Sequence, residues 1–163
     1  MNRFSDFQPT ELMLKQIQNF FEPRNIAVVG ASRTPGQIGN VMVSNLLTFQ
    51  FQGGIYPINP NATEILGLPC YPNVKQVKEK IDLSIICVPP QIVPLVIQES
   101  ADKGVKAAII ITAGFGELGQ EGKQLQNDVI TIAKTHDMRI LGPNCLGLMR
   151  TANKLNASFA DHM

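Results

Sequence analysis

Five short runs of mostly apolar, often β-branched residues recur along the chain without alternation between polar and apolar positions. They lie at residues 26–29, 54–58, 83–88, 107–111 and 139–141. Continuous apolar runs of this length are typical of strands in a parallel sheet that is buried on both faces. This feature constrains the fold most, because parallel strands need a crossover connection between them.

Helical patterns fill most of the intervals between these runs. Apolar residues recur at helical spacing in segments 37–49, 74–80, 91–103 and 118–136. A leading helix is predicted over 10–21, ending before Pro23. A short edge strand is expected around 68–71, where prolines restrict pairing. The order of elements predicts one α/β domain: a single doubly wound, Rossmann-like parallel sheet with helices on both faces.

Composition excludes several classes of protein. The 163 residues are 44% hydrophobic and 17% charged, with a net charge of +1, which indicates a globular domain without an electrostatic preference for nucleic acid or anionic membranes. No apolar run approaches the roughly 20 residues that a membrane span needs. Three cysteines lack metal-ligand spacing, so we expect a cytoplasmic protein with reduced thiols at Cys70, Cys87 and Cys145.

Ligands of doubly wound sheets bind beyond the carboxyl ends of the strands, at the switch point of the strand order. The residues that follow the five predicted strands are rich in Gly, Pro, Ser, Thr and Asn, and we expect them to meet at one edge. These loops begin at Gly30, Asn59, Pro89, Thr112 and Gly142.

The first loop, GASRTPGQIG, has the strand, glycine-rich turn and helix layout of a phosphate-binding site. Gly30 permits a tight turn, and the Ser32 hydroxyl and Arg33 guanidinium can contact a phosphate. Gly36 and Gly39 are expected to allow close packing of the helix on the strand. Ser32 replaces the second glycine of the dinucleotide fingerprint G-x-G-x-x-G.

The second loop disfavours a nicotinamide cofactor. A dinucleotide-binding fold normally ends its second strand in Asp or Glu, which holds the ribose hydroxyls. This chain has Asn59-Pro60-Asn61 there, and its first acidic residue is Glu64.

The remaining loops can accommodate a flat ring and a chain-like ligand, but each also has a structural explanation. Val88 and Pro89 can form a flat apolar wall, while Pro90 equally suits the first turn of a helix. Thr112 and the glycines after it can pass a chain-like ligand, whereas Glu117 is expected to serve as a favourable charge at a helix start.

No reaction centre is recognisable in the sequence. Asn144 can hold neighbouring backbone, and Cys145 is most simply a buried, inert thiol. His136 and His162 have no nucleophile or metal partner at a readable spacing, and no paired acids or Walker loop is present. We therefore expect the chain to bind a ligand without being catalytic by itself.

Together these motifs resemble the CoA-binding domain of the NDP-forming (ADP-forming) acyl-CoA synthetases, or acetate–CoA ligases, which are related to the α subunit of succinyl-CoA synthetase. The matching stretches cover about residues 20–150 in the family's order. They are FFEPRNIAVVGASRTPGQIGN, GGIYPINPN, LGLPCYPNV, IDLSIICVPP, AAIIITAGFGE and ILGPNCLGLM. In this family a serine occupies the position of Ser32.

The resemblance implies that the first loop meets the phosphates of coenzyme A, that Val88 and Pro89 flank the adenosine, and that residues 111–113 lie along the pantetheine. With the residues suggested by the loops themselves, the predicted cofactor-binding residues are Gly30, Ala31, Ser32, Arg33, Gly36, Asn59, Val88, Pro89, Ile111, Thr112, Ala113 and Asn144. One departure concerns a lysine that the family often carries after the second strand. This chain has Asn61-Ala62, which either weakens binding or shifts the charge role to Arg33.

The resemblance also implies a larger enzyme that converts acid, CoA and ATP into acyl-CoA, ADP and phosphate. Its phosphoryl-carrying histidine, its ATP-grasp domain and the ATP/ADP and Mg sites would lie in other domains or subunits. We expect a lead-in at 1–22, a CoA-binding domain at 23–150 and the start of a linker at 151–163. The alternatives are a stand-alone CoA- or nucleotide-binding regulatory module and the N-terminal domain of a protein-lysine acetyltransferase.

Overall fold

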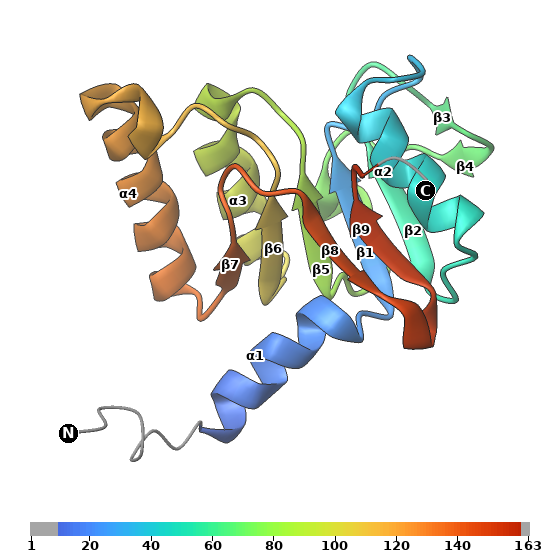
Figure 1. Ribbon diagram of the computed structural model, residues 1–163, viewed down its shortest axis with the longest axis horizontal. Coiled ribbons are helices and arrows are strands. Elements are labelled where there is room, and N and C mark those ends of the chain that lie inside the picture. Colours follow the sequence, from blue (N-terminus) through green and yellow to red (C-terminus); the bar gives the residue numbers. More distant parts are fainter. Residues whose placement is uncertain (1–9, 161–163) are drawn as a thin grey trace.

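Five parallel strands form the centre of the computed structural model, which describes residues 10–160 (Figure 1). In chain order they are β1 Asn25–Val29, β2 Gly54–Ile58, β5 Leu83–Ile86, β6 Ala107–Ile110 and β7 Arg139–Leu141. The spatial order is β2-β1-β5-β6-β7, and every neighbouring pair is parallel. All five predicted strands are confirmed, although β5 and β6 end slightly earlier than expected.

Helices cover both faces of this sheet, which confirms the predicted doubly wound α/β architecture. They are α1 Glu11–Phe21, α2 Ile38–Thr48, α3 Val93–Asp102 and α4 Gln120–Thr135. Helices α3 and α4 pack side by side over one face, while α1 and α2 contribute to the core on the other (Figure 1). Among the described residues, no helix has the length and apolar character needed to cross a membrane.

Each strand supplies side chains to two separate core layers. In β1, Ala27 and Val29 join the core beneath α3 and α4, whereas Ile26 and Val28 join the core on the α2 side. All four are buried. This division explains why the strands show no polar alternation, because both faces exclude water.

The segment predicted as a helix over 74–80 forms only one turn of 3-10 helix, Val74–Gln76. The Asn73 side chain caps this turn by accepting a hydrogen bond from the Gln76 N–H at 3.1 Å. Val77 then adopts an extended conformation, with φ −69° and ψ 125°. Val74, Val77 and Ile81 are all buried in the core, so the spacing that predicted a helix is retained although the chain after residue 76 is extended.

The predicted edge strand around 68–71 is instead split between two pairings. β4 Leu68–Pro69 pairs with β3 Glu64–Ile65 in a small antiparallel hairpin. Tyr71 alone bridges to Ile58 at the edge of the main sheet.

A second hairpin, β8 Gly147–Arg150 and β9 Leu155–Ser158, lies against α2 (Figure 1). Leu155 and Ala157 are buried, and the Asn45 side chain donates to the Ser158 carbonyl at 2.7 Å. Residues 151–158, where the sequence suggested the start of a linker, therefore pack on this domain in the structure.

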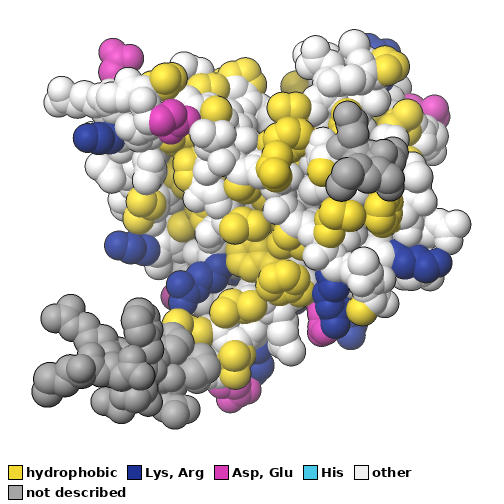
Figure 2. Space-filling view, in the orientation of Figure 1, with side chains coloured by type: hydrophobic (Ala, Val, Ile, Leu, Met, Phe, Trp, Pro, Cys, Tyr) yellow, Lys and Arg dark blue, Asp and Glu magenta, His cyan; other side chains and the backbone are white. Residues whose placement is uncertain are grey.

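Hydrophobic side chains are partly exposed around α1 and the hairpin. Figure 2 shows them gathered near the middle of this face, while Lys and Arg side chains are scattered around it. The exposed apolar residues of α1 and the β8 region are Leu14, Ile17, Phe21, Leu146 and Met149. This face therefore shows no basic patch of the kind that nucleic-acid binding requires.

Gly39 in the first turn of α2 allows us to test the close approach of this helix to the sheet. A Cβ atom at Gly39 would lie 2.0 Å from the Gly30 carbonyl oxygen. Helix propensity alone predicts that Gly39→Ala stabilises the protein by about 1 kcal/mol. We expect the clash to dominate and to lower the free energy of unfolding by about 1–3 kcal/mol in urea titrations. As a control, Ser44→Ala in the middle of α2 should change the free energy of unfolding by less than about 0.5 kcal/mol. A Gly39→Ala variant that is more stable than the wild type would contradict the close packing of Gly39 on the Gly30 carbonyl.

Candidate functional site

The strand order reverses between β1 and β5, which creates a switch point at their carboxyl ends. From β1 the chain passes outward to β2, and it then returns to β5 on the other side of β1. Gly30 follows β1, while Cys87 and Val88 follow β5, so these residues border the crevice where such sheets bind ligands.

Two glycines make the close contacts at this point possible. Gly30 has φ +85°, and a Cβ atom there would lie 2.7 Å from the Cys87 carbonyl oxygen. Gly39 of α2 packs directly on the Gly30 carbonyl. The predicted packing role is therefore confirmed for Gly39. Gly36 instead faces open space at φ +82° and serves the turn of the exposed loop.

The first loop is held by its own polar groups and leaves the start of α2 without a side-chain cap. The Ser32 hydroxyl accepts a hydrogen bond from the Thr34 N–H at 3.1 Å, and the Ser32 carbonyl accepts one from the Asn40 side chain at 2.8 Å. Gln37, at the N-cap position, makes no side-chain capping hydrogen bond. The first N–H groups of α2 are therefore free of a side-chain cap, and a helix start of this kind favours the binding of an anion.

Asn59 connects the second loop to the first. Its side-chain amide donates to the Ala31 carbonyl at 2.7 Å, while its side-chain oxygen accepts from the Asn61 N–H at 2.8 Å. The Arg33 guanidinium contacts the Asn61 carbonyl at 3.5 Å. No acidic side chain in residues 10–160 forms an ion pair with Arg33, so its charge remains available to a ligand.

The third, fourth and fifth loops are linked in the same way. The Thr112 hydroxyl donates to the Val88 carbonyl at 2.7 Å, and the Asn144 N–H donates to the Thr112 carbonyl at 3.0 Å. The prediction that the five loops meet at one edge is therefore confirmed. The side chains of Ala31 and Ile111 are buried in the core, so these two residues can offer a ligand only backbone groups.

A pocket of about 370 Å³ opens at the switch point. Four of the predicted residues line it: Gly30, Asn59, Val88 and Pro89. The pocket also has lining residues that were not predicted as binding residues; they include Pro60, Pro72, Asn73, Ile92, Leu95, Val96 and Glu99. The spacing of residues 92, 95, 96 and 99 could have predicted that they line a common surface. These positions share one face of the 3-10 turn Pro90–Ile92 and α3.

Glu117 stabilises the fourth loop. Its carboxylate accepts a hydrogen bond from the Gly114 N–H at 2.7 Å, and this bond lowers the pKa of the carboxyl group. Glu117 lies in a 3-10 turn, Gly116–Leu118, that precedes α4, so the expectation of a favourable charge near a helix start fits its place. A group with a lowered pKa is a poor general acid at neutral pH.

Burial raises the pKa of the thiols near the loops. All three cysteines are free thiols, and burial raises the pKa of Cys87 to about 12 and that of Cys145 above its ordinary value. His136 caps the end of α4, with Nδ1 3.0 Å from the Ile132 carbonyl oxygen, and His162 lies outside the described residues. Within residues 10–160 no cluster of His, Cys, Asp or Glu has the arrangement of a metal site.

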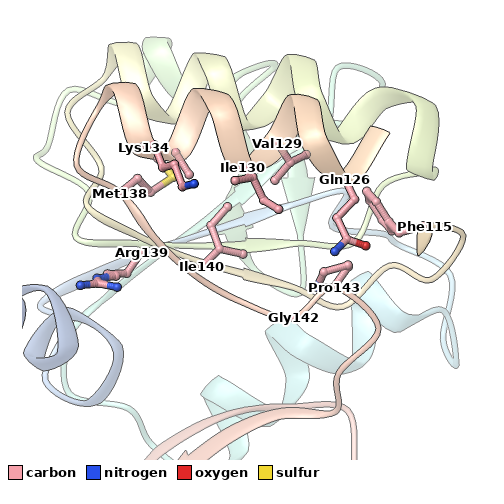
Figure 3. Close-up of a pocket in the computed structure, with 11 residues that line it drawn as sticks. Phe115, Gln126, Val129, Ile130, Lys134, Met138, Arg139, Ile140, Gly142 and Pro143 are labelled. Carbon is pink, nitrogen blue, oxygen red and sulfur yellow. The ribbon is translucent and has the colours of Figure 1, made fainter. Parts of the chain in front are cut away.

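A second hollow of about 230 Å³ lies at the β7 edge of the sheet, between α4 and β7 (Figure 3). Ile130 and Ile140 face it from the two elements, and Gly142 and Pro143 of the fifth loop complete it. None of the predicted binding residues lines this hollow. The fifth loop therefore borders both regions, and it reaches the switch-point loops through Asn144.

Comparisons with known proteins agree with this arrangement. A family model described as a CoA binding domain matches residues 24–151. An ADP-forming acetate–CoA ligase from Methanocaldococcus jannaschii is 49% identical over 138 residues, which cover 85% of this chain and 19% of that enzyme. The α subunit of ADP-forming acetate–CoA ligase II from Pyrococcus furiosus is 46% identical over 141 residues, which cover 86% of this chain and 30% of the subunit.

A solved structure shows the same fold at similar identity. The dinucleotide-forming acetyl-coenzyme A synthetase 1 of Ca. Korarchaeum cryptofilum, in complex with phosphate and ADP, superimposes with a TM-score of 0.86 at 42% identity. The match covers 90% of this chain and 31% of that one. The chain thus spans about a fifth to a third of these similar proteins.

Thr112 allows us to test the connection between the loops. Thr112→Val removes the donor to the Val88 carbonyl, and we expect the free energy of unfolding to fall by about 1 kcal/mol. Thr131→Val is the matched control, because the exposed Thr131 hydroxyl also donates to a backbone carbonyl, that of Asn127 within α4. Urea titration should show a lower free energy of unfolding only for Thr112→Val. Equal losses in both variants would mean that the Thr112–Val88 hydrogen bond stabilises the protein no more than an exposed hydrogen bond within a helix.

Proposed function

Because the chain belongs to the family of CoA-binding domains, we propose that it binds coenzyme A across the switch point described above. The observation that carries this proposal is the first loop, where Gly30 and Gly39 bring an uncapped helix start beside the strand ends. A helix start offers N–H groups and a positive dipole end to phosphates. The exposed Arg33 adds a charge at the same place.

Each part of the coenzyme has a matching region in this proposal. The phosphates meet the backbone of Gly30 to Arg33 and the Ser32 hydroxyl. The adenosine occupies the switch-point pocket against Val88 and Pro89. The pantetheine passes the exposed Ala113 and the Thr112 backbone towards Asn144. Asn59 acts as a positioning residue, because its side chain holds the first loop at Ala31.

We further propose that the chain serves as the CoA-binding domain of an ADP-forming acyl-CoA synthetase in the cytoplasm. Relatives that are 46% and 49% identical are ADP-forming acetate–CoA ligases or their α subunits. In that enzyme, ATP, Mg²⁺ and the phosphoryl transfer would be handled by other domains or subunits. The role of this domain is binding, since its described thiols and histidine lack catalytic partners.

Thermal unfolding with CoA, acetyl-CoA, NAD and NADP, each in separate excess, tests the proposed ligand. A ligand at about 100 times its dissociation constant adds roughly 2.7 kcal/mol of stability. At about 2–4 °C per kcal/mol, a true ligand should raise the melting temperature by several degrees. We expect a shift with CoA and none with NAD; a shift with NAD alone would overturn the proposal.

Ser32→Asp tests the assignment of the phosphates to the first loop. An aspartate can still accept the Thr34 N–H, so the loop should keep its shape while gaining a negative charge. We expect CoA affinity, measured by calorimetry, to fall by about tenfold or more. Thr131→Asp adds the same charge on the exposed side of α4 and should leave affinity unchanged. Equal affinity for the Ser32→Asp variant and the wild type would place the phosphates elsewhere.

A further inference from the structure

One face of the α3 region is apolar and exposed where it borders the switch-point pocket. Ile92 and Leu95 retain 43% and 60% of their accessible surface, although both are large and hydrophobic. With Val96 and Glu99 they follow the spacing of a single helical face, and all four line the pocket. This face therefore presents an apolar surface that ends in one carboxylate.

The opposite wall of the pocket is lined by prolines and suits a flat ring. Pro60 and Pro72 line it from the second loop and the segment after Tyr71, and Pro89 lines it from the third loop. Proline has no backbone N–H, so these positions offer apolar surface and no main-chain donor. The polar edge of a ring in this pocket must therefore be recognised largely by side chains.

Three polar side chains line the pocket, and the side-chain oxygens of two of them already accept hydrogen bonds. Asn59 uses both its amide and its oxygen to hold the loops, and the Asn73 oxygen accepts from the Gln76 N–H. The carboxylate of the half-buried Glu99 forms no hydrogen bond or ion pair with any residue in the described part of the chain. The Lys75 amine pairs instead with Asp102 at 2.8 Å, and this bond, with a smaller contribution from the Glu99 charge, raises the pKa of Lys75.

An ionised carboxylate can only accept hydrogen bonds, so Glu99 favours a ring that presents a donor. The exocyclic amine at C6 of adenine is such a donor, whereas hypoxanthine has an acceptor oxygen at C6 and its donor at the neighbouring N1. A carboxylate that faces the C6 substituent therefore favours adenine. We propose that Glu99 recognises the base of the bound nucleotide and selects an amino-purine over an oxo-purine at this position. The inference rests on the proposed binding of coenzyme A in this pocket.

The test compares two ligands by calorimetry: CoA and its analogue in which hypoxanthine replaces adenine. We expect the wild-type chain to prefer CoA by about tenfold or more, because a bond to a charged group is lost and an acceptor faces the carboxylate. Glu99→Gln supplies an amide that can donate to the hypoxanthine oxygen, so the preference should fall to about twofold or less. The ratio of the two affinities cancels any general effect of removing a negative charge near the phosphates.

Two further variants isolate the role of the carboxylate. Glu121→Gln makes the same change on an exposed part of α4 and should leave the ratio as in the wild type. Glu99→Ala should also reduce the preference, although it supplies no new donor. A wild type that binds both ligands equally, or a Glu99→Gln variant that keeps the preference, would overturn the inference while leaving CoA binding intact. A wild type that binds neither ligand would overturn the proposed function as well.

Discussion

The contact between Gly30 and Gly39 is the constraint on which the rest of the site depends. With no side chain at either position, α2 can pack on the carbonyl that follows β1, while Gly30 itself lies against the backbone after β5. These contacts bring two strand ends and one helix start to a single point. A larger residue at either position would separate the helix start from the crevice, and the N–H groups would no longer face the strand ends.

The other loops extend this arrangement by hydrogen bonds, two from side chains to backbone and one between backbone groups. Asn59 holds the first loop, Thr112 holds the third, and the Asn144 N–H connects the fifth to the fourth. A ligand that lies across all five loops therefore meets a surface whose shape is largely set before it binds. Such preorganisation reduces the entropy that binding must overcome.

The fold and the edge that carries the site were predictable from the sequence because both follow from local patterns. Unbroken apolar strands indicated a doubly buried parallel sheet, and the glycine-rich loop followed its first strand. The pocket walls at Leu95 and Glu99 were not predicted, since they depend on which helical face meets the second loop. The short turn at Val74 was also missed, because Val74, Val77 and Ile81 have the spacing of one helical face although the chain beyond residue 76 is extended.

The hairpin β8–β9 has a consequence for the order in which the site can be assembled. Helix α2, whose start is the proposed phosphate site, comes early in the chain, yet Leu155 and Ala157 cover part of its apolar side. The Asn45–Ser158 hydrogen bond completes that contact across more than a hundred residues. During synthesis, α2 therefore remains partly uncovered until the hairpin has emerged and folded back. The start of this helix is synthesised early, but the contacts that cover the helix form only after residues 155–158 have been made.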